Sequence, residues 1–323
     1  MEQTKAYAAA GGRRRPAGGE PKAHRSKRAR NEEICGTIMG ALPVVSVLLF
    51  SVVPMALAIV MAFFDMRTPV SFNGAEFVLF DNFAEVFSDP NFGTAIVNTL
   101  VYSLTLPISL VLALFIAAAL NATIKGTGIF RVILFLPFIC SSVAIAVMWS
   151  IIFEHQGVLN QLLGTDYNWL NDAERPYLLT WAIFIVILWP APGYGIIMYT
   201  AALKGIDMGL YEAAELDGAN EFHKFRNITL PMVAPMTYFL MLAGIMAGLG
   251  TFDQATILAP ISWTGTAGPE DAGLTVQYYI YYEMTEFGNM GYASVMQWAM
   301  TLITLIPCTT IMKLRKRAEE NIG

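Results

Sequence analysis

The chain has 323 residues, of which 55% are hydrophobic and only 14% are charged, and its mean hydropathy is +0.52. A soluble domain usually carries about 25% charged residues, so this composition excludes an ordinary soluble protein and indicates an integral membrane protein. The net charge of −5 excludes nothing by itself, because acidic and basic residues lie in different parts of the chain.

Six continuous apolar runs are each long enough to cross a bilayer as a helix. A transmembrane helix needs about 20 mostly apolar residues, and runs that are continuous rather than alternating argue against membrane strands. The fold class predicted is an all-α integral membrane protein. Its six transmembrane helices are expected at residues 34–64, 94–121, 131–153, 177–203, 236–260 and 288–314.

Basic residues are divided unequally between the two sides of these helices. Nine of the 20 Lys and Arg lie in residues 1–33, two flank the loop after the second run, three lie in residues 204–235 and four follow the last run. Only Arg67 and Arg175 remain for the opposite side. Because loops rich in Lys and Arg stay in the cytoplasm, we predict that both termini and residues 204–235 are cytoplasmic.

The two ends of the chain are polar. Residues 1–33 are rich in Gly, Arg, Lys and Ala and show no apolar period, which predicts a disordered basic tail. Such a tail helps to set the topology, and it could also contact anionic lipid headgroups. Residues 34–317 form the predicted transmembrane domain, and residues 318–323 form a short cytoplasmic C-terminus.

Two segments on the predicted outer side have patterns of their own. Residues 65–93 are acidic and rich in Phe, which predicts a small structure on the membrane surface, either an interfacial anchor or a docking surface for an external protein. Residues 158–163 are predicted to form a short surface helix. The three cysteines, Cys35, Cys140 and Cys308, all fall inside apolar runs, so we expect no disulfides.

A helix-breaking sequence interrupts the fourth apolar run. Residues 189–195 read WPAPGYG and contain two prolines and two glycines. At membrane depth, backbone that leaves the helix needs cover from protein or a water-filled cavity. The sequence therefore indicates either an element that lines a pathway or a kink that serves packing.

The fifth run carries an acidic residue near its outer end. A carboxylate inside a membrane span is costly and by default marks a functional position. Asp253, followed by Gln254, is therefore a candidate pathway residue, although its place near the end of the run is also typical of solvation at the interface. Gly244 and Gly248 form a small-xxx-small pair that allows close helix contact.

The polar segment 204–235 has the pattern of two short helices at an angle. Residues 212–216 are good helix formers. Asp217 can cap a following helix, and Gly218 can adopt the positive φ of a sharp turn. The second helix is expected to end at Leu230-Pro231. Such a unit would present side chains to a partner outside the membrane.

The sequence holds no convincing motif for catalysis. It lacks G-x-x-x-x-G-K-[ST], so the chain does not hydrolyse nucleotide by the P-loop route. The histidines His24, His155 and His223 are dispersed and match no metal-ligand spacing. We expect no catalytic residue, no metal site and no cofactor bound by this chain. An ion-gradient-driven secondary transporter, which would need several charges deep in its spans, and a non-transporting membrane scaffold remain alternative functions.

The residues of segment 204–235 follow one another at a spacing that is typical of a known family. The pattern is EAA, two residues, DGA, and then F, I and LP at fixed offsets. It is carried by Glu212, Ala213, Ala214, Asp217, Gly218, Ala219, Phe225, Ile228, Leu230, Pro231 and Pro235. This segment resembles the EAA loop of the membrane subunits of binding-protein-dependent ABC importers.

A second set of residues resembles the carbohydrate branch of that family, which includes the maltose and glycerol-phosphate transporter membrane subunits. The matching positions are Phe252-Asp253, Gly268-Pro269, residues 279–281 and residues 290–294. The outer segment TGTAGPEDAG departs from the Gly-Gly-Pro run of these relatives. The resemblance extends over about residues 34–317.

The resemblance implies the fold and the partners of this chain. The fold would be that of an ABC type I importer permease, in which the coupling-helix loop 204–235 lies in a groove of an ATPase subunit. Implied partners are a second permease subunit in a heterodimer, two ATPase subunits that bind ATP and Mg, an external sugar-binding protein and membrane lipid, but no nucleic acid. The chain would lie in the cytoplasmic membrane of a bacterium or an archaeon.

The resemblance also implies alternating access for a sugar. The residues that would couple to the ATPase are Glu212, Ala213, Ala214, Asp217, Gly218, Ala219, Phe225, Leu230 and Pro231. A sugar pathway needs aromatic faces for stacking and amides or carboxylates for the hydroxyl groups. The candidates of these types near the outer half of the bundle are Trp189, Tyr194, Phe252, Asp253 and Gln254.

Overall fold

The computed structural model describes residues 27–66, 74–121, 127–262 and 265–320. The chain divides into two compact units, residues 1–56 and 57–323. In the first unit, α1 (Lys27–Val47) is followed by one π-helical turn, η1 (Leu48–Val52), and by the start of α2 (Val53–Met61). Helix α1 therefore begins inside the segment 1–33 that we expected to be a disordered tail, while residues 1–26 lie outside the described part.

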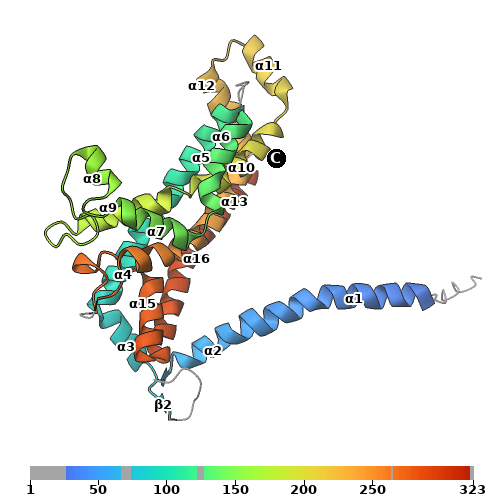
Figure 1. Ribbon diagram of the computed structural model, residues 1–323. Coiled ribbons are helices and arrows are strands. Elements are labelled where there is room, and N and C mark those ends of the chain that lie inside the picture. Colours follow the sequence, from blue (N-terminus) through green and yellow to red (C-terminus); the bar gives the residue numbers. More distant parts are fainter. Residues whose placement is uncertain (1–26, 67–73, 122–126, 263–264, 321–323) are drawn as a thin grey trace, which may run out of the picture. The chain divides into compact units, whose positions relative to one another are not determined.

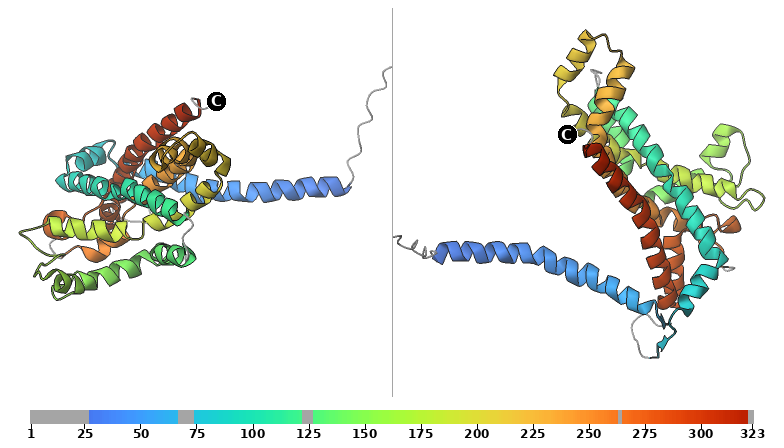
Figure 2. Two further views of the ribbon diagram at one scale, coloured as in Figure 1. Left: turned by 90° about the horizontal axis from the view of Figure 1, so that it is seen from above. Right: turned by 180° about the vertical axis from the view of Figure 1, so that it is seen from behind.

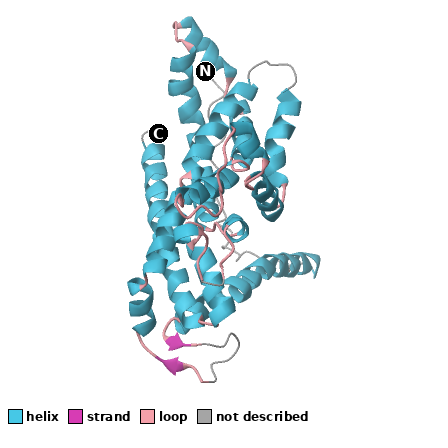
Figure 3. Ribbon diagram, turned by 60° about the vertical axis from the view of Figure 1, so that its left-hand side comes forward, coloured by secondary structure: helices cyan, strands magenta, loops and turns pink. Residues whose placement is uncertain are grey.

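The described part of the second unit is mostly helical (Figures 1 and 2). A two-stranded antiparallel ribbon, β1 (Phe64–Asp65) and β2 (Glu76–Phe77), lies at one of its ends (Figure 3). The helices, in chain order, are α3 (Asp81–Ser88), α4 (Pro90–Ser103), α5 (Thr105–Asn121), α6 (Thr127–Ile139), α7 (Ser142–Ile152), α8 (Val158–Leu163), α9 (Tyr177–Leu188), α10 (Pro192–Lys204), α11 (Met208–Leu216), α12 (Glu221–Lys224), η2 (Phe225–Thr229, π-helical), α13 (Leu230–Leu249), α14 (Asp253–Leu258), η3 (Pro269–Asp271, a 3₁₀ turn), α15 (Val276–Tyr282), η4 (Glu283–Phe287, π-helical) and α16 (Met290–Glu320).

Five helices of the described chain are long and apolar enough to span a membrane, or six if a bent pair counts as one span. The five are Cys35–Met61, Pro90–Asn121, Tyr177–Lys204, Glu221–Leu258 and Met290–Ala318, and the bent pair is Gly128–Ile139 with Ser142–Ile152. Five of the six predicted runs thus correspond to long helices. The short surface helix predicted at residues 158–163 is confirmed as α8.

The third predicted span differs most from expectation, because the run 131–153 forms two helices that meet at 96°. Pro137 lies in the last turn of α6, where it removes one backbone donor from the helix. Ser141 then has extended backbone angles (φ −61°, ψ 132°) and precedes α7 as its N-cap residue. Hydropathy cannot reveal this bend, since the residues on both sides of it are apolar.

The sequence predicted that the second helix of the polar segment ends at Leu230-Pro231, but this helix continues past these residues. Helices α12, η2 and α13 follow one another without a break from Glu221 to Leu249. In the π-turn η2 the amide of Leu230 donates to the carbonyl of Phe225, five residues back. Pro231 directly follows this π-turn, which locally replaces the regular hydrogen-bond pattern and so accommodates a residue without a backbone donor.

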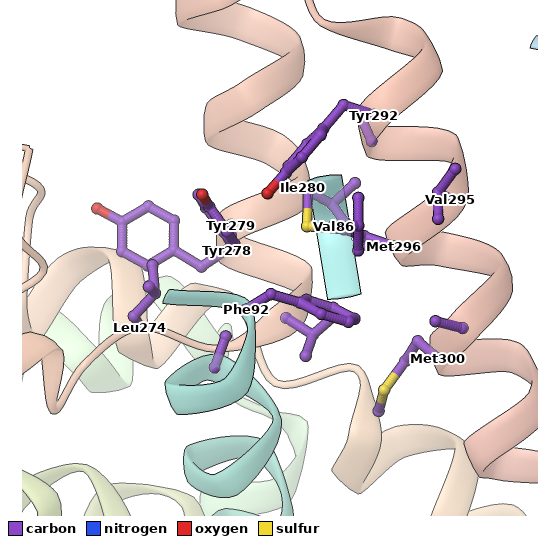
Figure 4. Close-up of a cluster of buried hydrophobic side chains, with 14 of the residues drawn as sticks. Val86, Phe92, Leu274, Tyr278, Tyr279, Ile280, Tyr292, Val295, Met296 and Met300 are labelled. Carbon is purple, nitrogen blue, oxygen red and sulfur yellow. The ribbon is translucent and has the colours of Figure 1, made fainter. Parts of the chain in front are cut away.

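Three clusters of buried side chains hold the second unit together. The first joins α3, α4, α15 and α16 through Phe92, Tyr292 and Met296 (Figure 4). The second joins α5, α10 and α13, and the third joins α7, α9 and α14. Many outward-facing side chains are large and apolar, including Leu302 and Ile306 of α16, as a surface in contact with lipid or another helix requires.

The segment between α14 and α15 is tied to α4 by buried polar contacts. The Nδ2 of Asn98 donates to the carbonyls of Asp271 (2.8 Å) and Leu274 (2.9 Å), and the hydroxyl of Tyr102 donates to the carbonyl of Ala272 (2.6 Å). These bonds satisfy backbone carbonyls that helices do not pair. The loop therefore has a fixed path over the helices below it.

Candidate functional site

A polar hairpin, α11 with α12, stands at one end of the second unit, and the C-terminal end of α16 lies at that same end (Figures 1 and 2). The opposite end carries α3 and the strand ribbon. We call the segment from Asp207 to Phe225 the coupling hairpin. It lies within the residues 204–235 that the sequence singled out.

Local capping explains why the coupling hairpin folds as two helices. Asp207 caps α11 by accepting from the amide of Gly209 (2.9 Å), and Asn220 caps α12 by accepting from the amide of His223 (2.9 Å). Asp217, which was expected to cap the second helix, instead lies at the C-terminal cap of α11. Gly218 has φ +79° and makes the turn between the helices, as predicted.

Side-chain contacts hold the two arms of the coupling hairpin together and fix it to the bundle. The ammonium of Lys224 in α12 lies 2.6 Å from a carboxylate oxygen of Glu221 and 3.8 Å from one of Glu215 in α11. The ring of Phe225 stacks on Phe115 of α5, with centroids 5.7 Å apart. The sequence left open whether Phe225 faces a partner or the bundle, and here it packs against the bundle.

The tip of the coupling hairpin exposes large apolar side chains. Leu216 is 90% exposed, Phe222 is 66% exposed and Met208 is 65% exposed. Leu216 and Phe222 lie on either side of the turn, whereas Met208 begins α11 at the other end of that helix. Two exposed apolar side chains at a turn in a polar part of the molecule favour a protein partner. Leu216 and Met208 were missing from the predicted coupling residues. Their signal in the sequence was the presence of isolated large apolar residues in an otherwise polar segment.

The predicted coupling residues occupy different surroundings. Glu212, Ala213, Asp217 and Gly218 are exposed on the hairpin, whereas Ala214, Ala219 and Phe225 are half-buried within it. Leu230 and Pro231 are exposed on the first turn of α13. The exposed members of this set thus lie on α11, at the turn and on the first turn of α13.

A pocket of about 470 Å³ opens among six helices of the second unit. We call it the central pocket. It is lined by residues of α5, α6, α9, α10, α13 and α14 and by the links that interrupt the fourth and fifth spans. Four predicted pathway residues line it together, namely Tyr194, Phe252, Asp253 and Gln254.

Trp189, the fifth predicted pathway residue, does not line the central pocket. Its ring is 44% exposed and packs edge-on against Trp149 of α7, with centroids 5.9 Å apart. It lies between α9 and α10, and residues on both sides of it, Ile187 and Ala191, line the pocket. The helix-breaking sequence lines the pocket through Ala191, Tyr194 and Gly195, whereas Trp189 does not.

Asp253 joins two interrupted spans. It begins α14, and its Oδ2 accepts a hydrogen bond from the hydroxyl of Ser142, the first residue of α7 after the 96° bend. The carboxylate is half-buried. The bent third span and the interrupted fifth span are thus connected beside the central pocket.

The sequence missed several residues of the central pocket. Phe138 of α6 stacks on Tyr194, with centroids 5.5 Å apart and planes inclined by 24°. Hydroxyl groups come from Thr105 and Ser109 of α5 and from Thr251. Small hydroxyl residues inside apolar runs were the only sequence signal for them. Among the described residues, no group of His, Cys, Asp and Glu side chains could hold a metal ion.

Known proteins are similar to this chain in sequence over most of its length. Residues 109–320 match the family model of the inner membrane component of binding-protein-dependent transport systems. The probable ABC transporter permease protein YesP of Bacillus subtilis is 33% identical over 87% of this chain and 92% of its own length. The lactose transport system permease protein LacF of Rhizobium radiobacter is 29% identical over 87% of this chain and 94% of its own.

A solved structure shares the fold. A chain of the bacterial ABC transporter involved in the import of the acidic polysaccharide alginate superposes with a TM-score of 0.72, covering 90% of this chain and 99% of that one at 22% identity. The overall fold of this chain thus occurs in a known transporter. The chain belongs to the family of inner membrane components of binding-protein-dependent transport systems.

Proposed function

We propose that this chain is a permease subunit of an ATP-driven sugar importer. The observation that carries the proposal is the coupling hairpin, whose turn needs the positive φ of Gly218 and whose tip exposes Leu216 and Phe222 to a partner. Names of similar proteins support a sugar as substrate, since they include permeases for lactose and arabinooligosaccharides.

The partners follow from the same proposal. A second permease subunit, in a heterodimer, would complete the pathway of which this chain forms half. Two ATPase subunits would bind ATP and Mg, because this chain carries no P-loop. An external sugar-binding protein would deliver the ligand. In support, a similar transporter has been solved in complex with an alginate pentasaccharide-bound periplasmic protein.

We further propose an orientation in the cell membrane. Residues 1–33, residues 318–323 and the coupling hairpin would lie in the cytoplasm, and residues 34–317 would form the membrane domain. The unequal division of Lys and Arg supports this orientation.

The mechanism would be alternating access. ATP binding would close the two ATPase subunits and move the coupling hairpins docked in them, so that the permease pair turns from inward-facing to outward-facing. A partner can shift this equilibrium only through different affinities for the two states. The coupling hairpin is the contact where such a difference would act, with Glu212 in polar contact and Gly218 holding the bend.

The experiment compares variants of the coupling hairpin in cells that express the complete transporter. Gly218→Val forces a branched side chain into φ +79°, which costs about 1–2 kcal/mol if the turn is kept. Glu212→Lys reverses one exposed charge. Both variants are expected to lose most co-purifying ATPase and most ATP-dependent sugar uptake.

The controls make the same kinds of substitution in the segment between the third and fourth spans, on the predicted outer side of the membrane. Gly164→Val introduces the same kind of backbone strain, because Gly164 has φ +64°. As at Gly218, an added Cβ would meet no atom within 4 Å, so the two variants differ in position and not in packing. Glu174→Lys reverses an exposed charge in the same outer segment. Both controls should retain the ATPase subunit. Unchanged association and uptake in both hairpin variants would refute the coupling role.

A further inference from the structure

The polar lining of the central pocket is unbalanced in charge. Asp253 contributes a carboxylate, and none of the described residues that line the pocket is Lys, Arg or His. A bound carboxylate or phosphate would therefore meet a like charge and no cation to offset it. In a site partly shielded from water this repulsion is stronger than in bulk solvent.

Several hydroxyl groups of the lining already use their proton in a hydrogen bond within the protein. The hydroxyl of Thr105 donates to the carbonyl of Tyr102 at the end of α4, and that of Ser109 donates to the carbonyl of Leu106 in α5 (both 2.7 Å). The hydroxyl of Thr251 donates to the carbonyl of Gly248 (2.8 Å). Each of these oxygens keeps its capacity to accept. At these positions the pocket wall therefore offers acceptors to a ligand, and its remaining side-chain donors are uncharged, namely the amide of Gln254 and the hydroxyl of Tyr194.

This wall fits a ligand that donates hydrogen bonds. A sugar hydroxyl can donate to the Asp253 carboxylate or to a hydroxyl oxygen of the wall. An ionised carboxylate or phosphate has only acceptors, so its oxygens would exchange water for two uncharged side-chain donors, Gln254 and Tyr194, with no cation to offset the charge of Asp253. The rings of Phe138, Tyr194 and Phe252 provide apolar faces for the C–H surfaces of a sugar ring.

We propose that the central pocket selects uncharged sugars and disfavours uronates and sugar phosphates, with Asp253 as the residue that sets this preference. The proposal rests on the proposed function as a sugar permease. It separates this chain from the structurally similar alginate transporter, whose substrate is an acidic polysaccharide.

The test measures binding to the membrane complex without the external protein, which has a selectivity of its own. The full-length chain is purified with its second permease and ATPase subunits in nanodiscs. Saturation-transfer NMR then compares three neutral disaccharides (gluco, galacto and manno) with the corresponding diuronates. Neutral disaccharides are expected to show at least about tenfold tighter binding than their diuronates, a difference of about 1.4 kcal/mol.

Variants separate the charge of Asp253 from its contacts. Asp253→Asn should bring each neutral disaccharide and its diuronate to within about threefold of one another, because about 0.7 kcal/mol or less would remain. Ser142→Ala removes the hydrogen bond to Asp253 but keeps the carboxylate, and should retain the full preference. Glu174→Gln, an exposed carboxylate away from the pocket, should also retain it.

The outcomes are distinct from those of the proposed function. A wild-type complex that binds any diuronate as tightly as its neutral partner, or that binds no disaccharide, overturns the preference. A preference that is unchanged in Asp253→Asn overturns the role of Asp253. ATP-dependent uptake and its loss in Gly218→Val can stand in either case, so a failure here does not count against the permease function.

Discussion

At the scale of single residues, the most unusual group outside the membrane spans is a set of three carboxylates, Glu85, Asp89 and Glu283. Asp89 accepts hydrogen bonds from the hydroxyls of Tyr279 (2.7 Å) and Tyr292 (2.6 Å). Burial raises the pKa of Glu283, the negative charges of Asp89 and Glu85 raise it further, and a hydrogen bond from Asn289 (2.7 Å) opposes the rise. The folded state therefore disfavours the ionised form of Glu283.

This arrangement predicts a pH-dependent stability. A carboxyl group whose pKa is raised in the folded state binds its proton more tightly there, so the stability it contributes is present at low pH and is lost as the pH rises through the folded pKa. Glu283→Gln keeps an acceptor for Asn289 and removes the charge. We expect it to raise the Tm of the purified protein at pH 8 by about 2–4 °C.

The comparison with wild type at several pH values isolates this effect. The gain in Tm should shrink as the pH falls toward the ordinary Glu pKa of about 4.3. Glu286→Gln, at an exposed glutamate three residues further on, should show no such trend. A lower Tm for Glu283→Gln at pH 8, or a difference that does not change with pH, would contradict the argument.

At the scale of elements, the coupling hairpin shows what sequence can and cannot predict. Its existence, its turn and the positive φ of Gly218 were predictable, because they depend on local propensity and spacing. The continuation of α12 into α13 was not, since a π-turn relieves the constraint of Pro231. Exposure also depends on tertiary packing, which placed Phe225 on Phe115 and left Leu216 outside.

Leu216 provides a test of the tip of the coupling hairpin. Because it is 90% exposed, Leu216→Ala should leave the Tm of the isolated chain unchanged. If the side chain fills a groove of the ATPase subunit, its loss should weaken the complex by about 1–3 kcal/mol, or roughly ten- to hundredfold. Leu162→Ala, at a 78% exposed leucine of α8, is the matched control for pull-down affinity. Equal affinities for the two variants would exclude Leu216 from the contact.

Two glycines make a matched pair for helix packing. A Cβ on Gly193 of α10 would lie 2.7 Å from the Cβ of Phe138 and 3.3 Å from the carbonyl oxygen of Leu134, both in α6, whereas a Cβ on Gly93 of α4 would meet nothing within 4 Å. Gly193→Ala should therefore cost about 1–3 kcal/mol through overpacking. Gly93→Ala should be neutral or stabilise by up to about 1 kcal/mol. Thermal unfolding in detergent measures both, and a Gly193→Ala variant as stable as wild type would refute the close contact of α6 with α10.

At the scale of the whole molecule, most of the fold was predictable because a bilayer leaves few choices. Long apolar runs must be helical to satisfy their backbone, and five of the six runs are long helices. The 96° bend in the third run was hidden because hydropathy records composition and not direction. The central pocket was only partly predictable, since Thr105 and Ser109 lie in one run and Asp253 lies in another, and only packing brings them together.

The orientation of the molecule is predicted from its charges and can be tested directly. Only two of the 20 Lys and Arg lie on the predicted outer side, and holding many cations on the wrong side of an energised membrane costs about 2.3 kcal/mol per charge at 100 mV. We replace the three native cysteines by Ser and introduce Asp166→Cys or Glu215→Cys, both at exposed positions. A membrane-impermeant thiol reagent should label Asp166→Cys on intact cells, and Glu215→Cys only after permeabilisation. The reverse result, with Glu215→Cys labelled on intact cells and Asp166→Cys only after permeabilisation, would place the coupling hairpin outside the cell. The hairpin could then not contact a cytoplasmic ATPase subunit.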